Sequence, residues 1–415
     1  MVVRLGVLLL LVAFVLAIIA PAASAVAPPP TRAAYSNSSF SPLPGFRYLG
    51  EVSPNQPVFG VLYVPLRNVP LIFYYAQAVS TPGSPLYHRF LTRQEVARLF
   101  YPTDEFNKAL NYLRAHGLRV VFTALDSMIV FEGPASAVES ALGVRVGLFS
   151  NGTTTYYAET GFTGNPLGLV PYVSNATPLF IKPAIARLSG LLPGSLMSSR
   201  QFLQSWEAYP LPDVVQAYNV TPLYKRGFMG QGVNVGVLDF YGDPQIYQIM
   251  AYFDQLFGLP RANLTVVPIG TYNPNLGLVT GWNYEIELDV ETVQSAAPYA
   301  HIYLYISAGY LPLATDIAFI DSQDAVSIVS QSFGIDESYL NTLGYASFFY
   351  NIYLTDIFYA LGSAEGITFL ASSGDAGGMG YSAGPVGDLG YPASSPWVLS
   401  VGGTTTYLNF YQNGT

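Results

Sequence analysis

Four short apolar runs in the second half of the chain constrain its fold more than any other feature. The runs read GVNVGVLDF, HIYLYISAG, VSIVSQSFG and ITFLASSGD, and each ends in small or polar residues. Segments long enough for helices separate them, which is typical of buried parallel strands in a doubly wound α/β sheet. Sites in such sheets lie beyond the carboxyl ends of the strands, where these runs place Asp239, Ser332 and Asp375. The sequence therefore predicts a parallel sheet with a functional site at that edge.

The first half of the chain predicts a smaller, mixed unit. PVFGVLYVPL is typical of a strand, LRVVFTALDSMIVFEG of two strands, and PASAVESALGV of a short helix. In LTRQEVARLF, Thr92 and Glu95 have the spacing of a capping box, which marks the start of a helix. We expect a small α+β domain over residues 45–185, a Ser/Gly/Pro-rich linker open to cleavage over 186–208, and a second domain over 209–415.

The chain begins with the pattern of a secretory signal peptide. Arg4 precedes a long apolar run that ends in small residues, with Ala23 and Ala25 at the spacing a signal peptidase accepts. We expect a signal peptide over residues 1–25, a Pro/Ser-rich leader over 26–44, and an extracellular product. The alternative is an uncleaved membrane anchor, because the apolar run is rather long for a signal core, and a membrane is expected as a partner only in that case.

Charge and cysteine content limit the possible partners and the forces that hold the fold. The net charge is −9 and Lys/Arg clusters are absent from the sequence, which argues against nucleic acid as a partner. Only 10% of residues are charged and there is no cysteine, so burial of aromatic and aliphatic side chains has to hold an exported fold. Because few native contacts depend on carboxylate charge, we expect the fold to tolerate acid.

The segment NYEIELDVETVQSAA concentrates four acids in a charge-poor chain. On a helical wheel, Glu285 and Asp289 lie about 40° apart and flank an apolar stripe, whereas Glu287 and Glu291 lie on the opposite side and are expected to face solvent. The stripe consists of Ile286, Val290, Val293 and Ala297. Two carboxylates at i and i+4 on a partly buried edge repel each other, so the pKa of at least one should be raised, as in a general base or a proton-sharing pair. The alternative is an ordinary solvated acidic helix.

Together, these motifs resemble the sedolisin, or serine-carboxyl, peptidases. EIELD resembles the Glu-x-x-x-Asp helix of that family, and GQGVNVGVLD, SQSFGIDE, ASSGDAGG and YPASSPWVLSVGGT resemble its other catalytic-domain segments in the family's order. Upstream, SPLYHRFLTRQEVARLFYPT and LNYLRAHGLRV are similar to the activation domain of the kumamolisin branch. The resemblance covers most of residues 50–405 and implies a subtilisin-like doubly wound parallel sheet preceded by a small α+β, ferredoxin-like activation domain.

The resemblance implies a catalytic role for three acids. Glu285 would be the base that takes the proton from a nucleophilic serine, Asp289 would orient it, and Asp375 would be the oxyanion acid. A carboxylic acid donates a hydrogen bond to an oxyanion only while it keeps its proton, which favours acidic pH. The alternative for Asp375 is a structural Asp in a Gly-rich turn.

The resemblance also implies a substrate-binding strand and a second layer of residues behind the pair. Ser330, Ser332 and Gly334 match the family's Ser-x-Ser-x-Gly strand, which binds substrate. Asp239 stands where the kumamolisin branch has a glutamate linked to the catalytic pair, and Phe333 stands where it has a tryptophan. Both are departures from the family pattern, so the resemblance does not carry the extended proton network of that branch over to this sequence.

The family's Gly-Thr-Ser nucleophile motif and its carboxylate-rich calcium site lie downstream of the VGGT element, and the sequence contains neither. We therefore expect a C-terminally incomplete sheet, no metal-binding residue in this sequence, and calcium only as a cofactor implied by the family. Ser394 and Ser395 lie between prolines and are expected to be turn residues rather than nucleophiles.

The sequence leads to one main hypothesis and two alternatives. The main hypothesis is the precursor of a secreted acid endopeptidase, with protein or peptide substrates and its own activation domain as an intramolecular partner. The first alternative is an inactive exported relative that binds peptides or inhibits a protease. The second is a subtilisin-type site with Asp239 and His301, which we disfavour because His301 opens a strand.

Overall fold

The computed structural model describes residues 43, 45–176, 215, 217–337, 345–378 and 388–403. The chain forms two compact units: unit 1 comprises Met1–Ser174, Gly344–Phe349 and Ala360–Glu365, and unit 2 comprises Asn175–Leu343, Tyr350–Tyr359 and Gly366–Thr415. The predicted signal peptide, the predicted linker and nearly all of the predicted leader lie outside the described residues. Within the described ranges, none of the helices combines the length and the apolar character needed to cross a bilayer.

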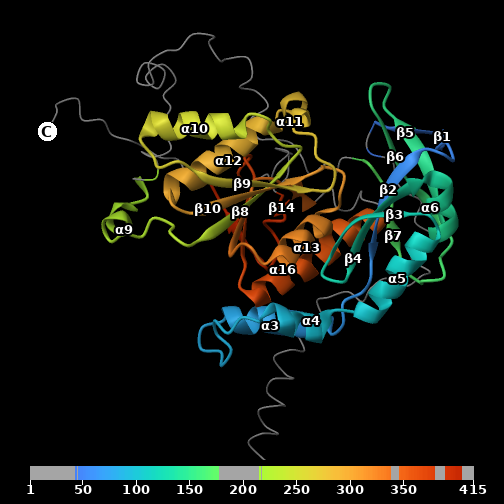
Figure 1. The fold of residues 1–415 in the computed structure, drawn as a ribbon, viewed down its shortest axis with the longest axis horizontal. Helices are drawn as coiled ribbons and strands as arrows, with labels where there is room; N and C mark the ends of the chain where they lie inside the picture. The colour runs from blue at the N-terminus through green and yellow to red at the C-terminus, as the bar shows by residue number, and fades with distance from the viewer. Residues whose placement is uncertain are drawn as a thin grey trace, which may run out of the picture. The chain divides into compact units, whose positions relative to one another are not determined.

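Unit 1 is a mixed α and β structure with two antiparallel sheets (Figure 1). The first sheet has the order β3-β4-β2-β7, with β2 (Pro57–Tyr63), β3 (Arg119–Ala124), β4 (Met128–Pro134) and β7 (Pro171–Tyr172). The second has the order β1-β5-β6, with β1 (Arg47–Glu51), β5 (Val144–Ser150) and β6 (Thr155–Phe162). In a ferredoxin-like unit, the strand after the second helix would pair with the first strand. Here β7 pairs with β2 while β5 joins the other sheet, so the ferredoxin-like detail is not confirmed.

Four helices accompany these sheets, namely α3 (Val69–Ser80), α4 (Arg93–Phe100), α5 (Thr103–Ala115) and α6 (Ala135–Leu142). Helix α4 begins with the predicted capping box, in which the Thr92 side chain accepts from the Glu95 N–H and Glu95 Oε2 accepts from the Thr92 N–H at 2.9 Å. One face of α5 and of α6 packs on the sheets, because their apolar residues recur at helical spacing. The core of unit 1 therefore lies between these two helices and strands β2, β4 and β5.

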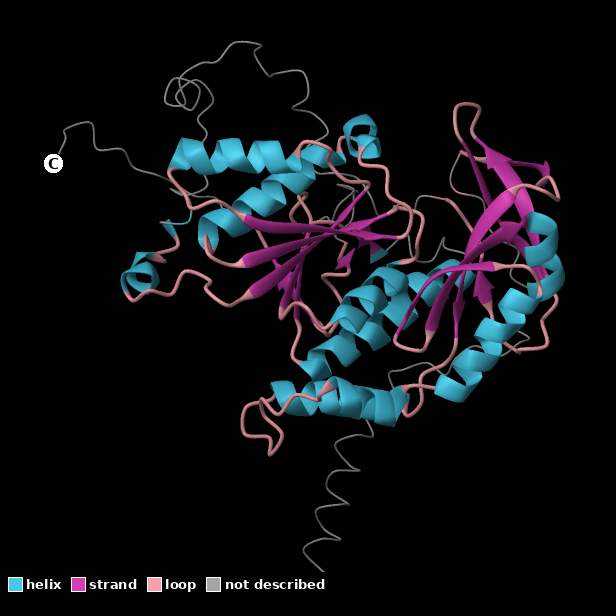
Figure 2. Ribbon diagram, in the orientation of Figure 1, coloured by secondary structure: helices cyan, strands magenta, loops and turns pink. Residues whose placement is uncertain are grey.

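Unit 2 contains a six-stranded parallel sheet (Figure 2). Its order is β15-β13-β11-β8-β10-β9, with β8 (Asn234–Phe240), β9 (Asn263–Ile269), β10 (His301–Ser307), β11 (Ile328–Gln331), β13 (Thr368–Ser372) and β15 (Val398–Val401). The four predicted apolar runs are β8, β10, β11 and β13, so the parallel-sheet prediction is confirmed. The smaller elements of unit 2 are α9 (Thr221–Lys225), α11 (Asn275–Thr280), β12 (Ile335–Asp336) and β14 (Gly390–Tyr391). Helix α15 (Tyr345–Phe348) belongs to unit 1, and the π-helix Phe349–Tyr353 begins in unit 1 and continues in unit 2.

Helices cover both faces of this sheet (Figure 1). Helices α10 (Ile246–Phe257) and α12 (Trp282–Ala296) share one face, because their apolar residues form a single cluster with Val237 of β8 and Leu304 of β10. The other face carries α13 (Leu313–Gln323) and the part of α16 (Leu354–Glu365) that belongs to unit 2. Burial on both faces explains why these strands are apolar throughout rather than alternating.

The path of the chain around β10 places α12 over the middle of the sheet. The connection from β8 to β9 through α10 and the connection from β9 back to β10 through α12 run in opposite directions. Both helices lie on one face, so one of the two crossovers is left-handed, which is rare among such connections. As a result, α12 contacts β8 as well as β10, and its side chains reach the carboxyl end of β8.

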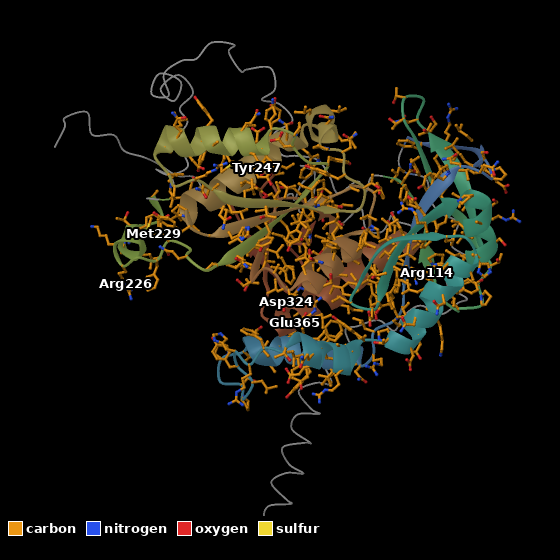
Figure 3. All side chains as sticks on the ribbon, in the orientation of Figure 1. Arg114, Arg226, Met229, Tyr247, Asp324 and Glu365 are labelled. Carbon is orange, nitrogen blue, oxygen red and sulfur yellow. The ribbon has the colours of Figure 1, made fainter. Side chains whose placement is uncertain are left out.

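The edge strand β9 was not predicted from the sequence, because Pro268 interrupts its apolar run. The N–H of Val266 donates at 3.3 Å to the hydroxyl of Tyr247, which Figure 3 labels on α10. The N–H of Ala262 donates to Asp254 Oδ2 at 2.7 Å. Pro268 has no N–H to offer. These features protect the edge from pairing with another strand.

Candidate active site

Three buried carboxyl groups meet at the carboxyl edge of the parallel sheet. Asp239 is the penultimate residue of β8, and Glu285 and Asp289 lie one turn apart on α12. Their exposed fractions are 0%, 4% and 9%. Asp239 lies two residues after Val237, so it points to the same face of the sheet, which is the face that α12 covers. The sequence predicted the paired positions on the helix and the strand-end position of Asp239, but not that all three would be buried together.

Burial and mutual repulsion oppose ionisation of this carboxyl cluster, defined as Asp239, Glu285 and Asp289. Burial, followed by the negative charges of Asp289 and Glu285, raises the pKa of Asp239 well above its ordinary range. Among the described residues, neither carboxyl oxygen of Asp239 has a hydrogen-bond partner. Asp239 therefore keeps its proton in the folded protein well above the pH at which an exposed Asp loses it.

The pKa of Asp289 is also raised, to about 6, and burial is the main cause. The Ser332 hydroxyl donates to Asp289 Oδ1 at 2.8 Å, which stabilises the charged form and limits the rise. The rise that we expected for at least one member of the pair is thus found for Asp289. Its origin is burial more than the predicted repulsion between residues one turn apart.

The prediction for the other two acids of α12 is wrong. Glu287 and Glu291 were expected to face solvent, but both are half-buried, and burial raises the pKa of each to about 7. Asn283 Nδ2 donates to Glu287 Oε1 at 3.2 Å, and the nearby Asp243 raises the pKa of Glu287 further. The physical reason is that α12 packs against α10 and α11 as well as the sheet, so more of its circumference is covered than one apolar stripe indicates.

The predicted substrate-binding residues lie at the end of β11. Ser330 pairs with Val237 of β8 and, like Ser332, points to the face that carries α12. Both serines are partly exposed, whereas Gly334 is buried. Of this set, Ser332 makes the direct link to the carboxyl cluster.

Phe333 is buried within a group of aromatic rings beside the cluster. Its ring lies 4.9 Å from the ring of Phe240, which lies 5.1 Å from the ring of Trp282 at the start of α12. These rings pack edge to face, which is a favourable arrangement of aromatic side chains. They tie the ends of β8 and β11 to the helix that carries the acids.

Asp375 lies three residues after β13 and is exposed. It does not contribute to the raised pKa of Asp239 or Asp289. The role of Asp375 as oxyanion acid therefore stays a prediction.

His301 and Ser395 both have hydrogen-bond partners outside the carboxyl cluster. His301 opens β10 and pairs in register with Asn234, five residues before Asp239 along β8, which is about 16 Å away at the usual rise of a strand. Its Nε2 lies 2.8 Å from Thr265 Oγ1. His301 is thus too far from Asp239 to form a catalytic pair with it. Ser395 is buried, and its hydroxyl donates to Asp356 Oδ1 at 2.7 Å, as befits a structural turn residue.

No group of three or more His, Cys, Asp or Glu suited to hold a metal ion is found in the described part of the chain. Calcium remains an implication of the family resemblance.

The fold and the carboxyl cluster define a mixed α/β protein with a buried acidic site at the carboxyl edge of a parallel sheet. Residues 44–179 match the family model described as "Pro-kumamolisin, activation domain". Kumamolisin from Bacillus sp. (strain MN-32) is 29% identical over 310 residues, which cover 72% of this chain and 54% of that protein. Sedolisin from Pseudomonas sp. (strain 101) is 24% identical over 375 residues, 86% of this chain and 61% of that protein.

Tripeptidyl-peptidase 1 from Canis lupus familiaris is 26% identical over 378 residues, 87% of this chain and 64% of that protein. The chain thus spans between 54% and 64% of the length of these relatives. The matches identify it as a relative of the sedolisin peptidases, as the sequence motifs predicted.

Proposed function

We propose that this chain is the precursor form of a secreted, acid-active serine-carboxyl endopeptidase. The observation that carries the proposal is the buried cluster of Asp239, Glu285 and Asp289 at the carboxyl edge of the sheet. The sedolisin relatives supply the reaction class, which is hydrolysis of peptide bonds by a serine-type peptidase.

In this proposal, Glu285 is the general base and Asp289 is the residue that orients it. Glu285 takes the proton from a serine hydroxyl as the oxygen attacks the substrate carbonyl, and later passes it to the leaving amine. Asp239 supports this step by keeping its own proton, because Glu285 and Asp289 would strongly repel its negative charge. The cluster then holds few enough charges to accept and return one proton in acid, where a histidine base would already be protonated.

Asp375 is proposed to donate a hydrogen bond to the oxyanion that forms during attack. A carboxylic acid donates such a hydrogen bond only while it keeps its proton. The requirement for a protonated acid at this position therefore restricts the proposed activity to low pH.

Peptide substrates are proposed to bind along Ser330, Ser332 and Gly334, where the chain leaves the end of β11. The activation domain (residues 45–185) is the proposed intramolecular partner, which is released from the peptidase part (209–415) by cleavage in the linker (186–208). Secretion through the signal peptide (1–25) belongs to the same proposal.

A second candidate function is an exported peptide-binding or protease-inhibiting relative. In that case Ser330, Ser332 and Gly334 would hold a peptide without hydrolysing it.

Hydrolysis of casein separates the two candidates. The protein to test is a fusion of these 415 residues with the Gly-Thr-Ser segment of a sedolisin relative. We expect it to cleave casein at about pH 4 and to release its activation domain, and to cleave little casein at about pH 7. Hydrolysis at both pH values alike would contradict the serine-carboxyl mechanism. A folded product that binds peptides in acid and cuts none would favour the second candidate.

A further inference from the structure

Strand β11 ends in a buried glutamine. Gln331 is the last residue of β11, is 1% exposed, and points away from the face that carries Ser330 and Ser332. Its Oε1 accepts a hydrogen bond from the Tyr359 hydroxyl at 2.6 Å, and its Nε2 donates to the carbonyl of Leu370 on β13 at 3.3 Å. The amide therefore joins three elements, namely β11, α16 and β13.

Tyr359 is fully buried on α16 and has no part in the proposed reaction. Its ring packs edge to face on Phe369 of β13, at 4.8 Å. An apolar residue at 331 would give a central strand similar stability, because a buried polar pair gains little over hydrophobic packing. What the hydrogen-bonded pair adds is one defined position of the end of β11 relative to α16, since any shift leaves a buried polar group without its partner.

The residue that follows Gln331 in the chain touches the carboxyl cluster. Ser332 points to the opposite face and donates to Asp289 Oδ1 at 2.8 Å. Tyr359 is thus connected to Asp289 by two hydrogen bonds on opposite faces of the sheet, which are joined by the peptide unit between Gln331 and Ser332.

We propose that Gln331 and Tyr359 are positioning residues that hold the end of β11 so that Ser332 keeps its hydrogen bond to Asp289. Neither residue is part of the proposed catalytic machinery. The inference rests on the proposed function for its catalytic meaning, but the test needs no hydrolysis.

The test is a titration of the Asp289 carboxyl by carbon-13 NMR in the full 415-residue protein labelled at Asp, with the resonance assigned by Asp289→Asn. Ser332→Ala removes the hydrogen bond directly and is expected to raise the pKa of Asp289 from about 6 by roughly one pH unit. Tyr359→Phe is expected to cause the same rise, because β11 loses its fixed position. The double variant is expected to show no more than the single rise, since both changes break one connection.

Tyr391→Phe is the matched control. Tyr391 is also a buried tyrosine, and its hydroxyl donates to Asp356 Oδ1 at 3.1 Å and to the carbonyl of Ile352 at 3.3 Å. Among the described residues, no hydrogen bond joins it to Gln331. This variant is expected to lower the melting temperature about as much as Tyr359→Phe and to leave the pKa of Asp289 unchanged.

Gln331→Met provides a second variant that keeps the volume of the side chain and removes the amide, and it decides the question should Tyr359→Phe fail to fold. A folded Tyr359→Phe or Gln331→Met protein with the wild-type pKa of Asp289 would overturn the proposal. An unchanged pKa of Asp289 in Ser332→Ala would also overturn the proposal, because the Ser332 hydrogen bond would then not stabilise the charged form of Asp289. Loss of the proposed peptidase function would change none of these outcomes.

Discussion

Replacing Glu285 by Gln is expected to lower peptide hydrolysis by roughly 10²–10⁴-fold in the fusion protein that carries the Gly-Thr-Ser segment with the nucleophilic serine. Gln keeps the shape and the hydrogen-bonding oxygen of the side chain but cannot take a proton from the serine hydroxyl. The loss should appear in kcat with little change in KM, because a base acts in the transition state and not in substrate binding. The measurement is kcat/KM for a peptide substrate at acidic pH.

Glu287→Gln is the matched control for this variant. Glu287 lies on the same helix, two residues away, is half-buried, and accepts a hydrogen bond from Asn283 that a Gln side chain can retain. Its substitution is expected to leave hydrolysis close to the wild-type rate. Wild-type activity in Glu285→Gln, or an equal loss in Glu287→Gln, would show that Glu285 is not the base.

Unit 2 is expected to lose stability as the pH rises from about 4 to about 8. The pKa of Asp289 is raised to about 6 and that of Glu287 and of Glu291 to about 7, in each case mainly by burial. In the folded state these groups keep protons that the unfolded chain releases above about pH 4. Their contribution to stability is therefore complete below that pH and is lost as the pH rises through 6 and 7.

The raised pKa of Asp289 alone lowers the free energy of unfolding by roughly 3 kcal/mol over this pH range, since each pKa unit is worth about 1.4 kcal/mol. The measurement is the urea midpoint of unfolding at acidic, weakly acidic and weakly alkaline pH. A protein that is more stable at about pH 8 than at about pH 4 would contradict the expectation.

Asp316→Asn tests the same idea away from the carboxyl cluster. Asp316 is fully buried on α13, and burial raises its pKa well above the ordinary value, with the Ser307 hydroxyl opposing part of that rise. In the described part of the chain, no ion pair involves Asp316. Asn has the shape of the protonated acid and cannot ionise, so the variant should lose less stability than the wild type as the pH rises.

Asp324→Asn is the control for this variant. Asp324, which Figure 3 labels, directly follows the same helix and is exposed. Asn tolerates the positive φ of 50° at this position. The profile of stability against pH should stay as in the wild type. An identical profile in Asp316→Asn would show that burial of this acid does not contribute to the pH dependence.

The elements that could be predicted from the sequence are those whose signal is local. Strands β8, β10, β11 and β13 are short apolar runs with polar ends, and the capping box of α4 needs only two residues three positions apart. The pairing of Glu285 with Asp289 follows from the helical repeat. Asp239 and Ser332 were placed at the correct edge because the ends of parallel strands lie together.

The remaining features depend on contacts between segments distant in sequence. The partial burial of Glu287 and Glu291 arises from the packing of α10 and α11 on α12, which no spacing within the helix reveals. The hydrogen bond between Gln331 and Tyr359 joins residues 28 positions apart. Gln331 occupies an unspecified position of the Ser-x-Ser-x-Gly pattern, and Tyr359 lies outside the motifs. A Gln at the end of a short strand was the one available signal.

The most direct measurement is a titration of the Asp239, Glu285 and Asp289 carboxyls by carbon-13 NMR in the folded protein. We expect at least one of the three to keep its proton above about pH 6, and Glu285→Gln to lower the pKa of Asp239 by removing one of the two charges that repel it. Three independent titrations near pH 4, like those of exposed carboxyls, would contradict a buried cluster that shares protons.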